Sequence, residues 1–187
     1  REYAANAPDT VAMIFGIDRA GPDAGYPDDL LGKPIVYLAW NHSGSAEDAE
    51  RDTAGLLVGP TPVVTTFGSA RYLDVQTAHD LVFAWGNRAS IRSHNANDVR
   101  REALDELVEL VATAPGEGTF SVTALGGAIG RVAEDATAYA GRASAFDLSA
   151  DAAWSDPELD EANAEWCRRV IAVVEADRAL GAYPNGN

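Results

Sequence analysis

The strand-like runs of this sequence occur in neighbouring pairs, and this order constrains the fold more than any other feature. Residues 10–17 (TVAMIFGI) form a continuous apolar run, and residues 34–40 (PIVYLAW) form a second one. The connection between them is rich in glycine, proline and aspartate and has no helical pattern, so the two runs are predicted to pair antiparallel. A parallel sheet would require strands and helices in stricter alternation.

The other predicted strands are short apolar stretches bounded by turn signals. They cover residues 61–67, 81–91, 119–125, 128–132 and 146–154, with a short last one at 180–183. Gly126 and Gly127 separate two of them, and we expect these glycines to supply a positive φ or a close backbone approach.

Helices are predicted between the strands. Ser45 begins an N-terminal capping box, and residues 70–78 form a short helix. Asn95 or Asn97 is expected to cap a longer helix with an apolar stripe, and Ser155 begins the last capping box. The resulting fold class is α+β, a mostly antiparallel sheet with helices packed on one face, of ferredoxin-like type. A chain of 187 residues with 47% apolar residues can form this as one domain, residues 1–187, with its own core.

The charge of the chain excludes some partners. It has 14 Lys and Arg against 29 Asp and Glu, a net charge of −15, and Lys33 is the only lysine. Such a surface repels phosphate backbones and anionic lipid, so we expect neither nucleic acid nor membrane as a partner. Halophilic origin and a GC-rich genome, which favours arginine over lysine, both account for this composition, and the sequence leaves the two open.

The ends and the cysteine content bear on localisation. The chain begins at Arg1 without a basic-then-apolar leader, so we expect a cytoplasmic protein and a piece of a longer polypeptide. No apolar run reaches the ~18 residues of a membrane helix. Cys167 is the only cysteine, so no internal disulfide can form.

Common chemical signatures do not occur in the sequence. His42, His79 and His94 are far apart and show no metal-ligand spacing, so no metal site is predicted. The glycines of residues 126–130 (GGAIG) do not have the spacing of a dinucleotide-binding loop.

Polar and apolar residues alternate in the strand predicted over residues 146–154. Asp147, Ser149 and Asp151 therefore share one face of that strand. This face is either solvated or forms a polar floor beneath a bound ligand, because sheets in two-layer α+β folds leave one face free.

Several motifs of the last third resemble those of berberine bridge enzyme-like FAD-linked oxidases. Residues 126–132 (GGAIGRV) and 136–142 (ATAYAGR) resemble the family's "GGA…v…ATAfpHR" stretch. Residues 147–157, with Trp154 and the following SDP turn, resemble its strand, tryptophan and "TDP" turn. Residues 181–185 (GAYPN) resemble its closing "GaYvN" motif. Looser likenesses upstream extend the resemblance over nearly the whole chain.

This resemblance implies that the chain is the C-terminal substrate-binding domain of a longer flavoprotein. FAD would be bound mainly by an N-terminal domain of the vanillyl-alcohol-oxidase type, which these residues lack. Tyr183 and Asn185 would border the flavin. The substrate would contact residues of the sheet and of the segment before its last strand, namely Ser149, Asn87, Arg88, Tyr139 and Arg142.

The chemistry implied is oxidation of a small organic substrate by hydride transfer to flavin, with a base that takes a proton. Asp147 and Asp151 are the candidate bases, because burial raises the pKa of a carboxyl group. The family's histidine before the arginine is Gly141 here, and no Tyr or Glu occupies the place of a base, so the catalytic base stays open. We expect the isolated chain to be inactive, with the FAD domain of the same polypeptide as partner. The alternative is a stand-alone ferredoxin-like domain that binds a small molecule or forms a homo-oligomer.

Overall fold

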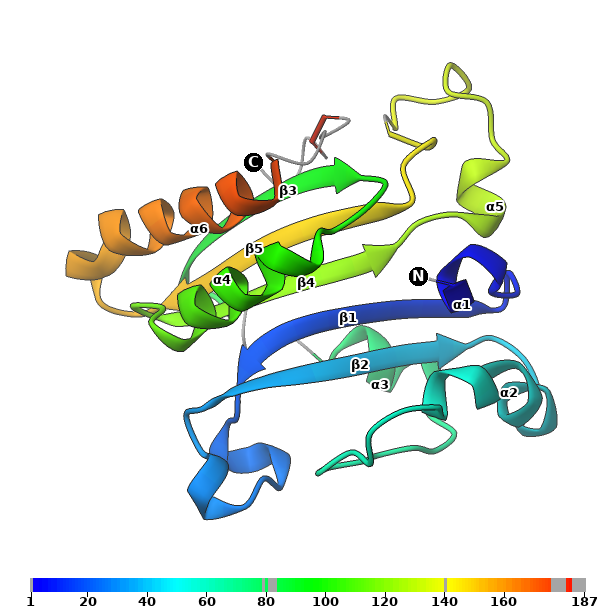
Figure 1. Ribbon diagram of the computed structural model, residues 1–187, viewed down its shortest axis with the longest axis horizontal. Coiled ribbons are helices and arrows are strands. Elements are labelled where there is room, and N and C mark those ends of the chain that lie inside the picture. The colour runs from blue at the N-terminus through cyan, green and yellow to red at the C-terminus, as the bar shows by residue number, and fades with distance from the viewer. Residues whose placement is uncertain (1, 79, 81–83, 140, 176–180, 183–187) are drawn as a thin grey trace.

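The described residues of the computed structural model form a single antiparallel sheet with helices on one face (Figure 1). The structure describes residues 2–78, 80, 84–139, 141–175 and 181–182. The five strands lie in the order β2-β1-β4-β5-β3. Their bounds are β1 Val11–Arg19, β2 Pro34–His42, β3 Arg88–Ala96, β4 Glu117–Ala124 and β5 Phe146–Trp154.

Two long helices cover one side of this sheet, and shorter helices lie at its margins. The helices are α1 Glu2–Asn6, α2 Ala46–Thr53, α3 Tyr72–Gln76, α4 Arg101–Ala112, α5 Gly127–Gly130 and α6 Asp160–Glu175, with 3₁₀ turns at Pro22–Ala24, Asp28–Leu30, Ala54–Leu57 and Pro157–Leu159. Figure 1 shows α4 and α6 side by side over the sheet, with α6 above β3 and β5. No helix that the structure describes is long and apolar enough to span a bilayer.

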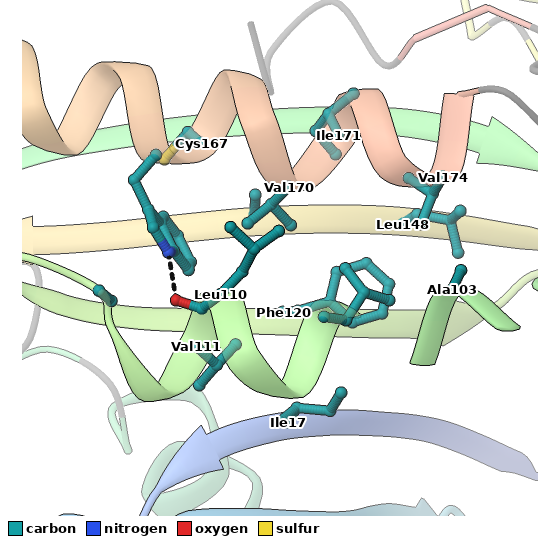
Figure 2. Packing of buried hydrophobic residues seen from close by; sticks show 14 of the residues in the cluster. Ile17, Ala103, Leu110, Val111, Phe120, Leu148, Cys167, Val170, Ile171 and Val174 are labelled. Atoms are coloured by element: carbon teal, nitrogen blue, oxygen red, sulfur yellow. Dashed lines mark hydrogen bonds between the residues drawn. The ribbon is translucent and has the colours of Figure 1, made fainter. Parts of the chain in front are cut away.

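The core lies between the sheet and these two helices (Figure 2). Phe120 of β4, Leu148 of β5 and Val170 of α6 are fully buried there. The indole Nε1 of Trp166 donates a hydrogen bond to the backbone oxygen of Leu110, 2.7 Å away, which ties α6 to α4. A buried indole needs such a partner, so this bond fixes how the two helices pack.

Close packing of the helices on the sheet depends on a glycine. A Cβ atom added to Gly118 of β4 would lie 2.7 Å from the Cβ of Ala114 and 2.9 Å from the ring of Trp166. The missing side chain therefore makes the space in which the indole lies against the strand.

The predicted fold class is confirmed, as is the antiparallel pairing of the first two strands. The capping box at Ser45 is also confirmed. Ser45 Oγ accepts a hydrogen bond from the Asp48 amide at 3.1 Å and donates one to the Asp48 carboxylate at 2.7 Å.

Other expected elements are wrong. Residues 128–132 contribute to the short helix α5 instead of a strand, and residues 61–67 form no strand. β3 spans Arg88–Ala96, so Asn95 lies inside a strand and caps no helix; α4 begins after Arg100, the N-cap residue. The reason is that β3 pairs with β5, which lies far away in the sequence and overrides the local preference of asparagine for helix caps. Of the strand expected at 180–183, residues 180 and 183 lie outside the described residues, and residues 181–182 form no strand.

Candidate functional site

The face of the sheet that α4 and α6 leave uncovered carries an ordered set of polar side chains. Residues that pair directly across strands point to the same side, so they form rows across the sheet. The first row holds Asn95, Asp147, Thr123, Ile14 and Ala39; the second holds Ser93, Ser149, Ser121, Gly16 and Tyr37; the third holds Ile91, Asp151 and Thr119. We call these three rows the polar platform. Asp18 of β1 lies on the same face beside the platform.

Asp147, Ser149 and Asp151 lie together on this uncovered face, where the alternation in the sequence predicts them. Their neighbours Leu148, Ala150 and Ala152 are buried beneath the helices. A single strand therefore contributes both to the core and to the polar platform.

The carboxyl group of Asp147 is half-buried and has an altered acidity. Burial raises its pKa to about 6, and the negative charge of Asp151 adds to the effect. One of its carboxylate oxygens, Oδ1, is buried without a hydrogen-bond partner in the described chain. A carboxyl group in this state can accept a proton near neutral pH.

Asp151 is held differently from Asp147. Ser149 Oγ donates a hydrogen bond to Asp151 Oδ1 at 2.8 Å, which favours the ionised carboxylate. Burial outweighs this bond, so the pKa of Asp151 is also raised above its ordinary value. The two carboxyl groups thus differ: Asp151 accepts a hydrogen bond from Ser149, whereas Oδ1 of Asp147 meets no donor among the described residues.

Tyr37 forms a side of the platform that sequence analysis missed. A Cβ atom added to Gly16 would lie 2.6 Å from the Tyr37 ring, so the ring lies across the glycine of the neighbouring strand. Burial raises the pKa of the Tyr37 hydroxyl to about 12, with contributions from the charges of Asp18 and Asp151. The phenol therefore stays protonated and can act as a donor on this face.

Ser93 and Asn95 border the platform on β3, the edge strand. Only 3% of Ser93 and 2% of Asn95 are exposed, yet Ser93 Oγ and Asn95 Oδ1 find no hydrogen-bond partner within the described chain. Buried polar atoms of native proteins normally have such a partner, in the protein or in water. These two atoms and Asp147 Oδ1 therefore leave unsatisfied acceptors at one end of the platform.

The segment before β5 covers this end. A Cβ atom added to Gly141, whose φ is 85°, would lie 2.1 Å from Asn95 Nδ2, so only glycine allows the segment to approach the amide so closely. Arg142 follows, with its guanidinium 5.0 Å from the ring centroid of Tyr139 and donating to Thr137. Both predicted residues, Tyr139 and Arg142, thus lie together next to the covered end of the platform.

Two other predicted site residues, Asn87 and Arg88, lie away from the polar platform, at the start of β3, where both line one hollow of the surface. Arg88 pairs with Trp154 at the opposite end of β3 and is bonded to Asp160 of α6, on the helix-covered side. The same Asp160 carboxylate accepts a hydrogen bond from the Trp154 indole at 2.7 Å. Arg88 therefore lies on the helix-covered side of the sheet, away from the polar platform, because Asp160 of α6 supplies its partner there. Its role in substrate binding stays a prediction. Tyr183 and Asn185 lie outside the described residues.

Two hollows of the surface, of about 260 and 420 Å³, are lined by residues outside the polar platform: Ala4, Ala5, Asn97, Asp98, Leu125, Ala145 and Phe146 for one, and Asn87, Arg88, Ala89, Ser90, Trp154, Asp160 and Ala164 for the other. No group of His, Cys, Asp and Glu able to hold a metal ion occurs in the part of the chain that the structure describes. A polar sheet face without a hollow of its own among those described needs a second body to enclose a small molecule.

Sequence comparison does not place the chain in a family. No protein-family model matches it. No curated protein matches it either.

Solved structures share its fold. BBE-like 1 from Physcomitrella patens is 17% identical with a TM-score of 0.75, over 98% of this chain and 40% of that one. Aclacinomycin oxidoreductase is 20% identical with a TM-score of 0.74, over 100% of this chain and 40% of that one. 6-Hydroxy-D-nicotine oxidase from Arthrobacter nicotinovorans is 16% identical with a TM-score of 0.70, over 100% and 41% of the two chains.

The chain thus spans about 40% of the length of the solved structures that it matches. These are BBE-like enzymes and other FAD-linked oxidases, and each shares the fold of this chain over about 40% of its own length. The family resemblance of the motifs therefore agrees with the fold.

Proposed function

We propose that this chain is the substrate-binding part of a longer FAD-dependent oxidoreductase, which oxidises a small organic molecule by hydride transfer to the flavin. The observation that carries the proposal is the polar platform, with the half-buried Asp147 at one end, on a fold shared with FAD-linked oxidases. Structural neighbours about two and a half times as long, judged from the 40% coverage, support a partner domain in the same polypeptide.

The residues present fit the substrate side of a flavin site but not the phosphates of FAD. None of the residues in the three rows is a lysine or arginine, and the carboxylates of Asp147 and Asp151 would repel a pyrophosphate. The unsatisfied acceptors of Ser93, Asn95 and Asp147 instead suit the donor groups of a substrate. When bound, FAD would supply the hydride acceptor; Tyr183 and Asn185 stay candidates for bordering it.

On this proposal Asp147 accepts the proton that the substrate loses from an O–H or N–H group. A carboxyl group with a pKa of about 6 is mostly ionised at neutral pH and is basic enough to take that proton. Asp151 keeps the field at Asp147 negative, and Ser149 holds Asp151 in place. Tyr139 and Arg142 are proposed to orient the substrate from the segment that covers one end of the platform.

The connection between α2 and β3 supports docking of a partner domain. It exposes large apolar side chains that a lone domain would normally cover: Leu57, Val58, Val63, Phe67, Tyr72, Leu73 and Trp85. Exposed apolar groups of this size mark surfaces for association. The same residues support the alternative of a stand-alone domain that self-associates.

The test uses the full-length flavoprotein in anaerobic flavin-reduction kinetics. Asp147→Asn, which removes the base and keeps the shape, is expected to slow flavin reduction by roughly 10²–10⁴-fold. Asp105→Asn, the same change at an exposed position of α4, should leave the rate unaltered. A parent polypeptide that contains no flavin would contradict the proposal and favour the stand-alone domain.

A further inference from the structure

One end of the polar platform holds a cluster of oxygen atoms that nothing in the described chain satisfies. Asn95 and Asp147 are paired residues of β3 and β5, and Ser93 pairs with Ser149 one row further along. Paired side chains of antiparallel strands have Cβ atoms about 5 Å apart. Asn95 Oδ1, Ser93 Oγ and Asp147 Oδ1 are thus close enough for one small group to contact more than one of them.

These oxygen atoms are buried, whereas the polar atoms of a solvated sheet face are exposed to water. Asn95 and Ser93 are more than nine-tenths buried, so bulk water does not reach them freely. The Gly141 segment closes over the Asn95 amide, and Asn95 N donates to the oxygen of Gly181 at 2.7 Å. The rest of each residue is therefore fixed in place, while the side-chain oxygens stay without donors. Such a cluster has a strong preference for a group that brings donors with it.

We propose that this cluster is a subsite for a protonated amine of the substrate. An ammonium group brings three N–H donors and a positive charge, which match two neutral oxygens and one carboxylate. This inference rests on the proposed function for calling the ligand a substrate, and it narrows the class of substrate to amines.

The charges around the cluster favour a cation over a neutral or anionic group. Facing Asp147 are Asp151 on its own strand, Thr123 and Ser121 on β4, and Ser93 and Asn95 on β3, with Asp18 and Tyr37 further across the platform. The covering segment contributes one cation, Arg142, whose guanidinium lies over the Tyr139 ring and donates to Thr137 while its Nε is buried without an acceptor among the described residues. The carboxylates of Asp147 and Asp151 repel an anion, and an alcohol offers a single donor without compensating their charge.

The test measures binding to the 187-residue chain itself, without flavin. The isotopically labelled chain is titrated with benzylammonium chloride, benzyl alcohol and sodium benzoate at pH 7.5 in moderate salt, followed by amide chemical shifts in NMR spectra. Benzylammonium is expected to shift the Asn95 side-chain amide and the backbone amides of Gly141 and Asp147, and to bind at least tenfold more tightly than benzyl alcohol. Benzoate is expected to cause no shift there.

Variants locate the binding. Asp147→Asn should weaken benzylammonium binding about tenfold or more and Ser93→Ala by a few-fold, since each removes one acceptor and keeps the backbone. The matched control Asp105→Asn changes the net charge equally on the helix side, and it should bind as the unmodified chain does. Lowering the pH to 5 should weaken binding of the amine by about tenfold, because the pKa of Asp147 is about 6 and the amine stays charged.

The inference is overturned if benzyl alcohol or benzoate binds as tightly as the amine, or if no probe binds and the cluster holds water only. It is also overturned if the shifts spread over the acidic surface and weaken equally in Asp105→Asn. Each of these results can occur while Asp147→Asn still slows flavin reduction in the full-length protein, in which case the proposed function stands and the amine class fails. If the chain binds the amine selectively but the parent protein contains no flavin, the amine subsite stands and the proposed function fails.

Discussion

The two faces of the sheet are made by the same strands and satisfy opposite requirements. On the face beneath α4 and α6, Leu148, Phe120 and Val170 are fully buried among apolar neighbours. On the other face, Asp147 and Ser93 place polar atoms where they are shielded from water, yet no described residue gives these atoms a hydrogen-bond partner. Burial of the first kind stabilises the fold, and burial of the second kind costs stability unless a ligand supplies the missing bonds. Alternate residues of one strand therefore have different roles: those that point to the helices stabilise the fold, and those that point to the other face form the candidate site.

The largest effect expected from this comparison is in the core. Phe120→Ala removes a fully buried ring from the helix-covered face and should lower the free energy of unfolding by about 3–5 kcal/mol. The neighbouring Ser121→Ala changes the polar face instead and should alter it by less than about 1 kcal/mol. Urea unfolding followed by circular dichroism measures both. Similar losses for the two variants would show that the faces are not energetically distinct.

A smaller effect is expected where the helix layer approaches the sheet most closely. Gly118→Ala forces a methyl group against Ala114 and Trp166, so the free energy of unfolding should fall by about 1–3 kcal/mol. The control is Gly68→Ala, at a position where an added Cβ meets nothing within 4 Å. A Gly118→Ala variant as stable as the control would mean that the indole of Trp166 can move away without cost.

The smallest effect, of opposite sign, is expected on the polar face. Asp147→Asn should stabilise the chain at pH 8 by about 1–2 kcal/mol, a value reduced from the full pKa shift because the carboxyl group is only half-buried. The pKa of Asp147 is raised from 3.8 to about 6 on folding, so the folded chain binds the proton more tightly than the unfolded chain between these values. The destabilising contribution of Asp147 therefore shrinks as the pH falls from about 7 to 4, and the advantage of the variant shrinks over the same interval.

Thermal unfolding of both proteins from pH 4 to pH 8 checks this prediction. Asp105→Asn, at an exposed position, serves as the control and should show no such pH-dependent difference. A variant less stable than the unmodified chain at pH 8 would mean that Asp147 has a stabilising partner when ionised.

Features that depend on the residue pattern within one strand could be predicted from the sequence. The bounds of β5, Phe146–Trp154, and the shared face of Asp147, Ser149 and Asp151 follow from the alternation of polar and apolar residues. The fold class follows from the neighbouring strand-like runs, because a parallel sheet would require strands and helices in stricter alternation.

The rest of the candidate site depends on pairing between distant segments. Ser93 and Asn95 join the platform only because β3 pairs with β5 in a register that no local pattern contains. Tyr37 joins it because its ring crosses a glycine on the adjacent strand, which no pattern within β2 indicates. Arg88 lies away from it because Asp160, from a helix later in the chain, provides an ion-pair partner. Each of these positions depends on a contact between segments that are distant in the sequence. They could be predicted only if the pairing of the strands and the packing of the helices were already known.

The strand order has a consequence for how the chain folds as it is synthesised. β4 is flanked by β1 and β5, and β5 alone joins β3 to the rest of the sheet. The hairpin of β1 and β2 therefore waits for residues 117–124 before it gains a third strand, and β3 stays unpaired until residues 146–154 have left the ribosome. Contacts so distant in sequence form slowly. During translation the most vulnerable intermediate is consequently a nascent chain with two exposed sheet edges, the state in which a chaperone would be most needed.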